Sequence, residues 1–294
     1  MLSLHTNAAS LSTQNSVGNT QKALSTSLTR LGTGFRVNSA MDDAAGLQIA
    51  TRLDAQTRGM AVAQRNTQNG ISMMQTAEGA FSELSNVLLR MKDLATEAFT
   101  ASTTANDKTA LQAEYDALGL ELSNIVRSSS FGGSRLFSNG TTTDGSAGLL
   151  SASVSFQIGA SASETMAVDT ATNLTALATA LGNVSSNYAG FAAPAAGTEL
   201  TGGTNAIITT IDTAITAVGT VRAQLGAASN RLDHVYNNLG NMITNVSSSR
   251  GRIMDVDYAV ETSNSTSKQL LLQAGTSALK QSSSMSQLVM SLMQ

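Results

Sequence analysis

The stretch ITTIDTAITAVGTVRAQLGAASNRLDHVYNNLGNMITNV, residues 208–246, decides which fold this chain can adopt. Positions spaced alternately by three and four residues run through its whole length, and all but Arg222 and Ser229 are apolar or aromatic. These positions are Ile208, Ile211, Ile215, Val218, Arg222, Leu225, Ser229, Leu232, Tyr236, Leu239, Ile243 and Val246. A helix of this length would measure roughly 58 Å, several times the average globular helix. The spacing predicts a coiled-coil helix.

Two further runs carry the same spacing earlier in the chain. The first, within residues 74–98, comprises Met74, Ala77, Phe81, Leu84, Leu88, Met91, Ala95 and Ala98. The second, after a polar gap, comprises Leu111, Tyr115, Leu118, Leu122 and Ile125, with Asn106 or Asp107 as its expected N-cap. We expect these helices to pack side by side with the helix of residues 208–246 as a rod within one molecule.

Residues 139–203 have a different character, rich in Gly, Ser, Thr and Ala with turn signals such as Asn139-Gly140. Val154, Phe156 and Ile158 alternate with polar neighbours, as in a half-buried strand. Residues 131–137, FGGSRLF, predict a small hairpin with glycines in its turn. The predicted fold class is therefore mainly α, with long antiparallel coiled-coil helices from both chain ends and a small β-containing outer excursion.

The two ends lack Asp and Glu altogether over residues 1–41 and 262–294. Each carries a narrow apolar stripe: Leu24, Leu28, Leu31 and Phe35 at one end, and Leu271, Ala274, Ala278, Met285, Leu288 and Leu292 at the other. A helix with so narrow a stripe is marginal alone in water. We expect these ends to be disordered in the free monomer and helical when packed, against each other or, more favourably, between molecules.

Composition and charge exclude several functions. Aromatic residues make up 4% and charged residues 13% of the 294, Cys and Trp are absent, and the net charge is −3. The five basic residues of the two ends lack interleaved aromatics, which argues against nucleic-acid binding. No run approaches the ~18 apolar residues of a membrane span, and the N-terminus lacks the features of a cleaved secretory signal.

The sequence also lacks clusters of residues typical of a metal-binding or catalytic site. His5 and His234 have no second ligand at metal-binding spacing. Asp255-Val256-Asp257 lacks the glycine and distal Glu of a calcium loop, and Asp42-Asp43 is better placed to start a helix. No Gly-x-Ser-x-Gly elbow is present. We expect neither catalysis, nor a metal, nor a cofactor.

The motifs at both ends resemble those of bacterial flagellins. At the N-terminal end they are LGTGFRVNSA (31–40), DDAAGL (42–47), residues 66–74, QTAEGA (75–80) and RMKDLA (90–95). At the C-terminal end they are LGA (225–227), NRL (230–232), RGRIMDVDYA (250–259) and QAGTSAL (273–279), and FQIGA (156–160) lies in the middle. The match covers about residues 1–138 and 203–294, in the same order as in the family.

This resemblance implies an extracellular structural protein that polymerises into the flagellar filament and leaves the cell without a cleaved signal peptide. It implies five segments: inner-tube helices at 1–40 and 252–294, rod helices with a hairpin at 41–138, a rod helix at 203–251, and a variable surface region at 139–202. The self-assembly residues would be Leu24, Leu28, Leu31, Phe35, Leu271, Ala278, Met285, Leu288 and Leu292. Expected partners are further copies of the chain, an export chaperone, and the filament cap and hook–filament junction proteins.

The resemblance also implies a contact with a vertebrate innate immune receptor through Arg90, Leu94 and Glu114. The alternative for these residues is a solvated ion pair beside a core leucine, and Leu89 departs from the polar residue common in the family. The alternative for the whole protein is a secreted, needle-tip-like helical factor that forms small oligomers. A coiled-coil signalling module would need a membrane span or partner domain.

Overall fold

The computed structural model describes residues 7–189 and 196–292, with the side chains of residues 285–292 outside the description. Within this part the chain is mainly α-helical, as the stripes predict. The helices are α1 (Ala8–Thr33), α2 (Ala44–Ala98), α3 (Ala105–Ser128), α4 (Ala171–Val184), α5 (Ala206–Met254) and α6 (Tyr258–Leu292), with a 3-10 turn, η1 (Leu149–Ser151). The strands are β1 (Ser130–Phe131), β2 (Ser134–Arg135), β3 (Val154–Gln157) and β4 (Thr165–Val168), paired antiparallel as β1–β2 and β3–β4.

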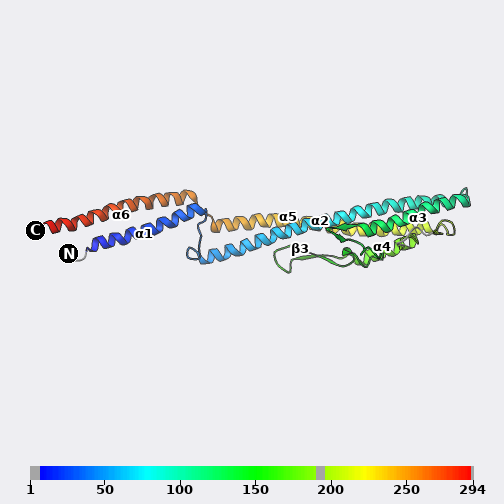
Figure 1. The fold of residues 1–294 in the computed structure, drawn as a ribbon, viewed down its shortest axis with the longest axis horizontal. Coiled ribbons are helices and arrows are strands. Elements are labelled where there is room, and N and C mark those ends of the chain that lie inside the picture. The colour runs from blue at the N-terminus through cyan, green and yellow to red at the C-terminus, as the bar shows by residue number, and fades with distance from the viewer. Residues whose placement is uncertain (1–6, 190–195, 293–294) are drawn as a thin grey trace. The chain divides into compact units, whose positions relative to one another are not determined.

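The chain forms two compact units. The terminal unit contains Met1–Thr57 and Thr244–Gln294, and the central unit contains Arg58–Ile243. Figure 1 shows α1 beside α6 in the terminal unit, and α3 and α4 beside α2 and α5 in the central unit. Both units are therefore helical assemblies made from segments far apart in the sequence.

Two ion pairs show that α2 and α5 run antiparallel in the central unit. Lys92 Nζ lies 2.6 Å from an oxygen of Asp212, near the start of α5. Arg222, further along α5, lies 2.8 Å from Glu78, which comes earlier on α2. The long helices from the two halves of the chain thus pair as the sequence predicts.

The α2 stripe predicted from the sequence is confirmed, because all of its members are buried in the core of the central unit. They are Met74, Ala77, Phe81, Leu84, Leu88, Met91, Ala95 and Ala98. At about 25 cal/mol per Å² of apolar surface, this continuous stripe is a major stabilising contribution to the unit.

The helical spacing predicted for α5 is correct, but only one of the two predicted columns of the stripe is buried. One column of it, spaced by seven residues, is buried: Ile211, Val218, Leu225, Leu232 and Leu239. The second buried column is Ala214, Val221 and Ala228, not the predicted Ile215, Arg222 and Ser229. Small residues in that column let α5 approach its neighbours, and Arg222 lies at the edge, where it pairs with Glu78.

The third predicted helix needs two corrections. Its N-cap is Thr104 rather than Asn106 or Asp107: the Thr104 hydroxyl accepts from the Asp107 N–H, and the Asp107 carboxylate accepts from the Thr104 N–H. This reciprocal pair is a capping box, which satisfies two donors at the helix start. The buried face of α3 also includes polar residues beside Tyr115 and Leu122, namely Gln112, Asp116 and Ser123.

The excursion between α3 and α5 starts with the predicted hairpin. Gly132 and Gly133 form its turn with positive φ of 58° and 86°, which glycine adopts without strain. Past the hairpin, the ring of Phe137 packs on Phe81 of α2, with ring centroids 4.6 Å apart. The hairpin is thereby anchored to the core.

The predicted strand around Phe156 is β3, which pairs with β4. It packs closely on α2, since a Cβ built on Gly70 would lie 2.9 Å from the ring of Phe156 and 3.2 Å from Leu232. The sequence analysis missed β4 and α4. Helix α4 buries Leu174, Leu177, Leu181 and Val184 in the same core.

Candidate functional site

The terminal unit carries the first candidate site, the surface of the α1·α6 pair. The two helices run antiparallel: Arg30, near the end of α1, lies 3.9 Å from Glu261, near the start of α6. At the other end the Asn7 side chain donates to the Ser282 carbonyl at 3.1 Å. The pair therefore stays in contact over most of the described length of both helices.

We call the contact between these helices the terminal seam. Its members repeat every three or four residues and are buried or half-buried, whereas most of their neighbours are exposed. They are Ser10, Thr13, Val17, Thr20, Leu24, Ser27 and Leu31 on α1, and Glu261, Ser265, Lys268, Leu272, Gly275, Leu279 and Ser282 on α6. Most members are small or polar, so the seam buries little apolar surface and stabilises the pair weakly.

Backbone hydrogen bonds link the two connectors beside the seam. Phe35 and Asp255 form an isolated antiparallel bridge, in which Arg36 donates to the Met254 carbonyl at 2.6 Å and Val256 donates to the Gly34 carbonyl at 3.0 Å. Two of the four acidic residues around these connectors cap helices. Asp43 accepts from the Gly46 N–H at the start of α2, and Asp257 accepts from two N–H groups at the start of α6.

Some of the predicted self-assembly residues are buried or half-buried between the helices, and others are exposed outside the seam. Leu24 is 7% exposed and belongs to it, and Leu31 and Phe35 are half-buried. By contrast, Leu28 is 51% and Leu271 61% exposed, and Ala278 is also exposed. The side chains of Met285, Leu288 and Leu292 lie outside the described residues.

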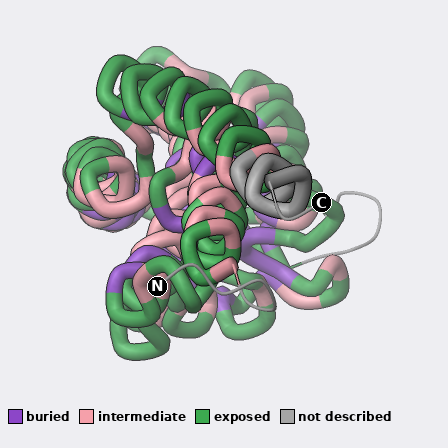
Figure 2. Tube along the Cα trace, turned by 90° about the vertical axis from the view of Figure 1, so that its left-hand side faces the viewer, coloured by how far each residue is buried: buried purple, intermediate pink, exposed green. Residues whose placement is uncertain are grey.

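The α6 stripe therefore does not face α1, because the seam uses Leu272, Gly275 and Leu279 instead. The predicted stripe lies one residue away in sequence, about 100° around the helix, so it is exposed outside the seam. Other large apolar side chains are exposed on the same two helices: Leu11, Tyr258, Val260 and Leu270. In Figure 2, α6, which leads to the C-terminus, is mostly exposed and intermediate along its described length.

Exposed apolar side chains of this size favour association. Burying one leucine contributes about 1.5–3 kcal/mol relative to leaving it in water. Those on α1 and α6 are spread along two helices rather than gathered around a cavity. The arrangement suits contact with other helices better than binding of a small molecule.

The second candidate site is the surface around Arg90 on α2. Its guanidinium donates to Glu114 of α3, with Nη2 to Oε1 at 2.6 Å, and the hydrogen bond and charge of Glu114 raise the pKa of Arg90. Both side chains are exposed, and Leu89 beside them is half exposed. Leu94, in contrast, is 0% exposed and lies in the core. The structure thus brings Arg90 and Glu114 together and separates Leu94 from their surface.

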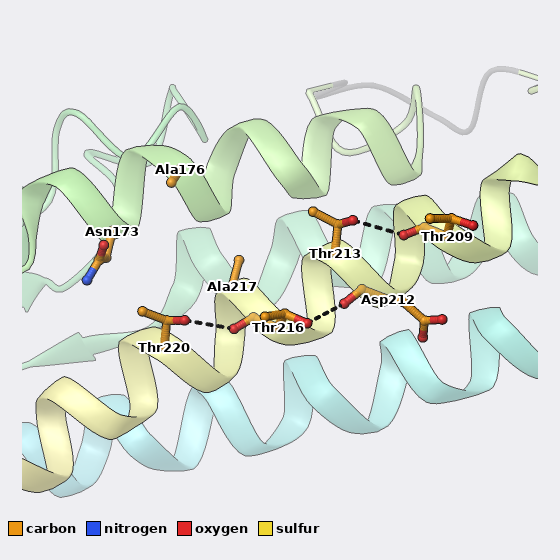
Figure 3. Close-up of a pocket in the computed structure, with 8 residues that line it drawn as sticks. All are labelled: Asn173, Ala176, Thr209, Asp212, Thr213, Thr216, Ala217 and Thr220. Carbon is orange, nitrogen blue, oxygen red and sulfur yellow. Dashed lines mark hydrogen bonds between the residues drawn. The ribbon is translucent and has the colours of Figure 1, made fainter.

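A shallow groove between α4 and α5 is a third feature, with a volume of about 460 Å³. Figure 3 shows its threonine side chains along α5. The hydroxyls of Thr213, Thr216 and Thr220 each donate to a carbonyl four residues earlier in the same helix. Asp212, also at the groove, is paired with Lys92. The polar groups are engaged locally, so the groove presents little recognition chemistry.

The described residues hold no group of three His, Asp or Glu side chains arranged for a metal ion. One described helix, α5, is long and apolar enough by composition to cross a membrane. Its apolar columns lie instead in the core of the central unit, against α2 and the excursion.

Long helices paired through a thin seam, with apolar side chains left outside it, define a helical structural protein that associates with other helices. Comparison with known proteins gives the family. Residues 4–142 match the family model of the bacterial flagellin N-terminal helical region, and residues 208–293 match that of the bacterial flagellin C-terminal helical region. The chain belongs to the bacterial flagellin family. Neither model includes residues 143–207, which contain nearly all of the predicted variable region.

Two Vibrio flagellins agree with this assignment. Flagellin D of Vibrio anguillarum is 32% identical, with 99% of each chain covered. Flagellin D of Vibrio cholerae is also 32% identical, with 95% of this chain and 96% of the relative covered. Among solved structures, the crystal structure of Bacillus cereus flagellin is 30% identical over 60% of this chain and 88% of that one, with a TM-score of 0.45.

The resemblance seen in the sequence motifs is thereby confirmed. As a flagellin, the chain is a structural subunit of the extracellular flagellar filament and not an enzyme.

Proposed function

We propose that this chain polymerises through the outer side of its α1·α6 pair, and that both end segments become ordered as neighbouring subunits cover them. The observation that carries the proposal is the exposure of Leu28, Leu270 and Leu271 outside a seam made mainly of small and polar residues. A pair so weakly held gains most of its apolar burial from neighbours. The contacts are heterologous, so they generate an open helical polymer.

Removal of the end segments tests this proposal. We expect chains lacking residues 1–40 or 252–294 to remain monomeric in sedimentation and electron microscopy, while the intact chain forms long filaments of uniform diameter. Circular dichroism of the intact chain should show helicity rising on polymerisation. Filaments formed by either truncated chain, or an unchanged helical signal, would contradict the proposal.

The same experiment separates the alternative function. A needle-tip-like factor would yield small soluble oligomers from the intact chain, whereas the filament subunit yields long filaments. The export chaperone, the filament cap, the hook–filament junction proteins and export without a cleaved signal peptide are further parts of the proposal. They are supported by family membership and follow from the need to deliver and cap such a polymer.

We also propose that the surface of Arg90 and Glu114 is recognised by the vertebrate flagellin receptor, with Leu94 supporting α2 from within. Exposure of the Arg90–Glu114 pair on adjacent helices favours this role. In a receptor-reporter assay, we expect Arg90→Ala to weaken signalling and Lys280→Gln, a change to an exposed residue of α6, to leave it unchanged. Equal signalling by Arg90→Ala and the unsubstituted chain would remove Arg90 from the contact.

A further inference from the structure

The apolar members of the terminal seam do not define its register. Val17, Leu24 and Leu31 are spaced by seven residues on α1, and Leu272 and Leu279 are spaced by seven on α6. If α6 slid by one heptad along α1, Leu272 and Leu279 would again meet equivalent heptad positions of α1 in the stretch that remained in contact. A repeat of this kind specifies the period of a helix pair but allows alternative registers.

The charged members break this repeat. Lys268 Nζ donates to the Ser27 hydroxyl at 2.6 Å and to the Ala23 carbonyl at 3.3 Å, and Ser27 is fully buried. Seven residues earlier on α6, Glu261 is also buried and lies 3.9 Å from Arg30. Each of these groups has a partner of suitable charge or polarity in the observed register.

Both one-heptad slips place the charges badly. In one slip Lys268 takes the place of Glu261 and faces Arg30, so that two like charges meet. In the other, Glu261 takes the place of Lys268, loses its cation and faces the Ala23 carbonyl, which is an acceptor, with the Ser27 hydroxyl as the donor beside it. A buried carboxylate that has lost its cation is strongly unfavourable.

The cluster is poorly suited to stabilisation alone. Arg30 also lies 3.5 Å from Asp42, so its guanidinium is divided between two carboxylates at long distance. Arg30 Nε and Glu261 Oε1 are buried without a hydrogen-bond partner. Buried ion pairs of this quality contribute little net stability, and their best-attested use is to specify register.

We propose that Glu261 and Lys268, acting on Arg30 and Ser27, lock the register of the α1·α6 pair and thereby fix which side chains remain outside it for neighbouring subunits. A slip would displace Leu270 and Leu271 along the pair by about 10 Å. The inference rests on the proposed function only in that the pair is measured in filaments.

Paired cysteines test the register directly, because the chain has no native cysteine. Val17→Cys with Gly275→Cys reports the observed register, since a Cβ on Gly275 would lie 2.8 Å from a methyl of Val17. Val17→Cys with Ser282→Cys reports the slip that brings Lys268 to Arg30, and Thr20→Cys with Ser265→Cys reports the opposite slip without adding a side chain at Gly275. Filaments are mildly oxidised and dissociated without reductant. Intramolecular disulfides are then measured in the species that migrates as a monomer, because chains joined by intermolecular disulfides migrate as larger species.

In the otherwise unsubstituted chain we expect the in-register pair to cross-link roughly tenfold or more over either slipped pair. Glu261→Gln with Lys268→Gln should bring the slipped pairs to within about threefold of it, while Lys268→Arg should retain the preference because it keeps the donor and the charge. The matched control is Lys22→Gln with Lys280→Gln, two exposed lysines of the same helices, which should change nothing.

An undiminished in-register preference in the Glu261→Gln/Lys268→Gln variant overturns the inference. So does efficient slipped cross-linking in the otherwise unsubstituted chain. Failure of the proposed function looks different, because the chain then forms no filaments by electron microscopy whatever the disulfide pattern.

Discussion

At the scale of single residues, Gly70 shows how close approach depends on the absence of a side chain. It is buried on α2, where the ring of Phe156 on β3 and a methyl of Leu232 on α5 occupy the space of its missing Cβ. Three elements meet at this position. Gly79, nine residues later on the same helix, is exposed and has nothing within 4 Å of a built Cβ.

These two glycines should therefore respond oppositely to alanine. Gly70→Ala adds a methyl to a filled space, which costs about 1–3 kcal/mol and outweighs the helix-propensity gain of about 0.5–1 kcal/mol. Gly79→Ala should show the gain alone. Chemical denaturation followed by circular dichroism measures both changes. A Gly70→Ala protein as stable as its Gly79→Ala counterpart would refute the close packing of β3 on α2.

At the scale of elements, the spacing of apolar residues predicts where helices form better than it predicts which face of each helix is buried. The alternation of three and four residues identified the second half of α2, from Met74 onward, as well as α3 and α5, because any helix that buries one face must show it. It did not decide between Ile215 and Ala214 on α5, since both lie within one residue of the same stripe. That choice depends on how closely the neighbouring backbones approach, a tertiary property.

Two further misses have similar causes. Helix α4 was hidden by its Ala- and Thr-rich composition, although the spacing of Leu174, Leu177, Leu181 and Val184 carried the helical signal. The outward direction of the Leu271 stripe was not predictable, because α6 has two apolar faces one residue apart. The choice between them follows from the register of α1 against α6.

A carboxylate clamp holds the end of the excursion to α3. Glu199 accepts from the Ser186 N–H and hydroxyl at 2.8 Å each and from the Gln112 side chain at 2.8 Å. The same Gln112 amide donates to buried Asp116 at 2.8 Å. Burial raises the pKa of Glu199. The hydrogen bonds from Ser186 and Gln112 lower it by a larger amount, so the pKa lies below its ordinary 4.5.

This shift gives the stability of the central unit a predictable pH dependence. A lowered folded pKa means that the ionised clamp contributes stability above pH 4.5, and that this contribution is lost as the pH falls through the folded value. Thermal unfolding between about pH 6 and about pH 3 should therefore show a smaller acid loss for Glu199→Gln than for the unsubstituted protein. Glu121→Gln, at an exposed position of α3, serves as the control and should behave like the unsubstituted protein.

At the scale of the whole molecule, the two units satisfy their apolar surface differently. The central unit buries the whole predicted stripe of α2 and two columns of α5, whereas the terminal unit leaves large apolar side chains on α1 and α6 in solvent. The sequence foretold this contrast, since the ends combine narrow stripes with few charges. Under the proposed function, folding of the central unit is largely intramolecular, and that of the terminal unit is completed by association.

A single substitution outside the seam should expose this division. Leu271→Asp changes a side chain that is 61% exposed, so the central unit should melt as before. Its effect should appear in polymerisation, with the critical concentration rising roughly tenfold or more, because a neighbour would have to bury a charge in place of a leucine. Sedimentation across a concentration series measures the change. Leu149→Asp, at the exposed first residue of η1 in the excursion, is the matched control, and equal effects of the two would contradict the assignment.

The bridge between Phe35 and Asp255 has a mechanical consequence. Two separate passages of chain, one leaving α1 and one entering α6, are tied by backbone hydrogen bonds at the same level. Neither passage can bend alone without breaking those bonds. A load applied to either passage is therefore shared by the two backbones.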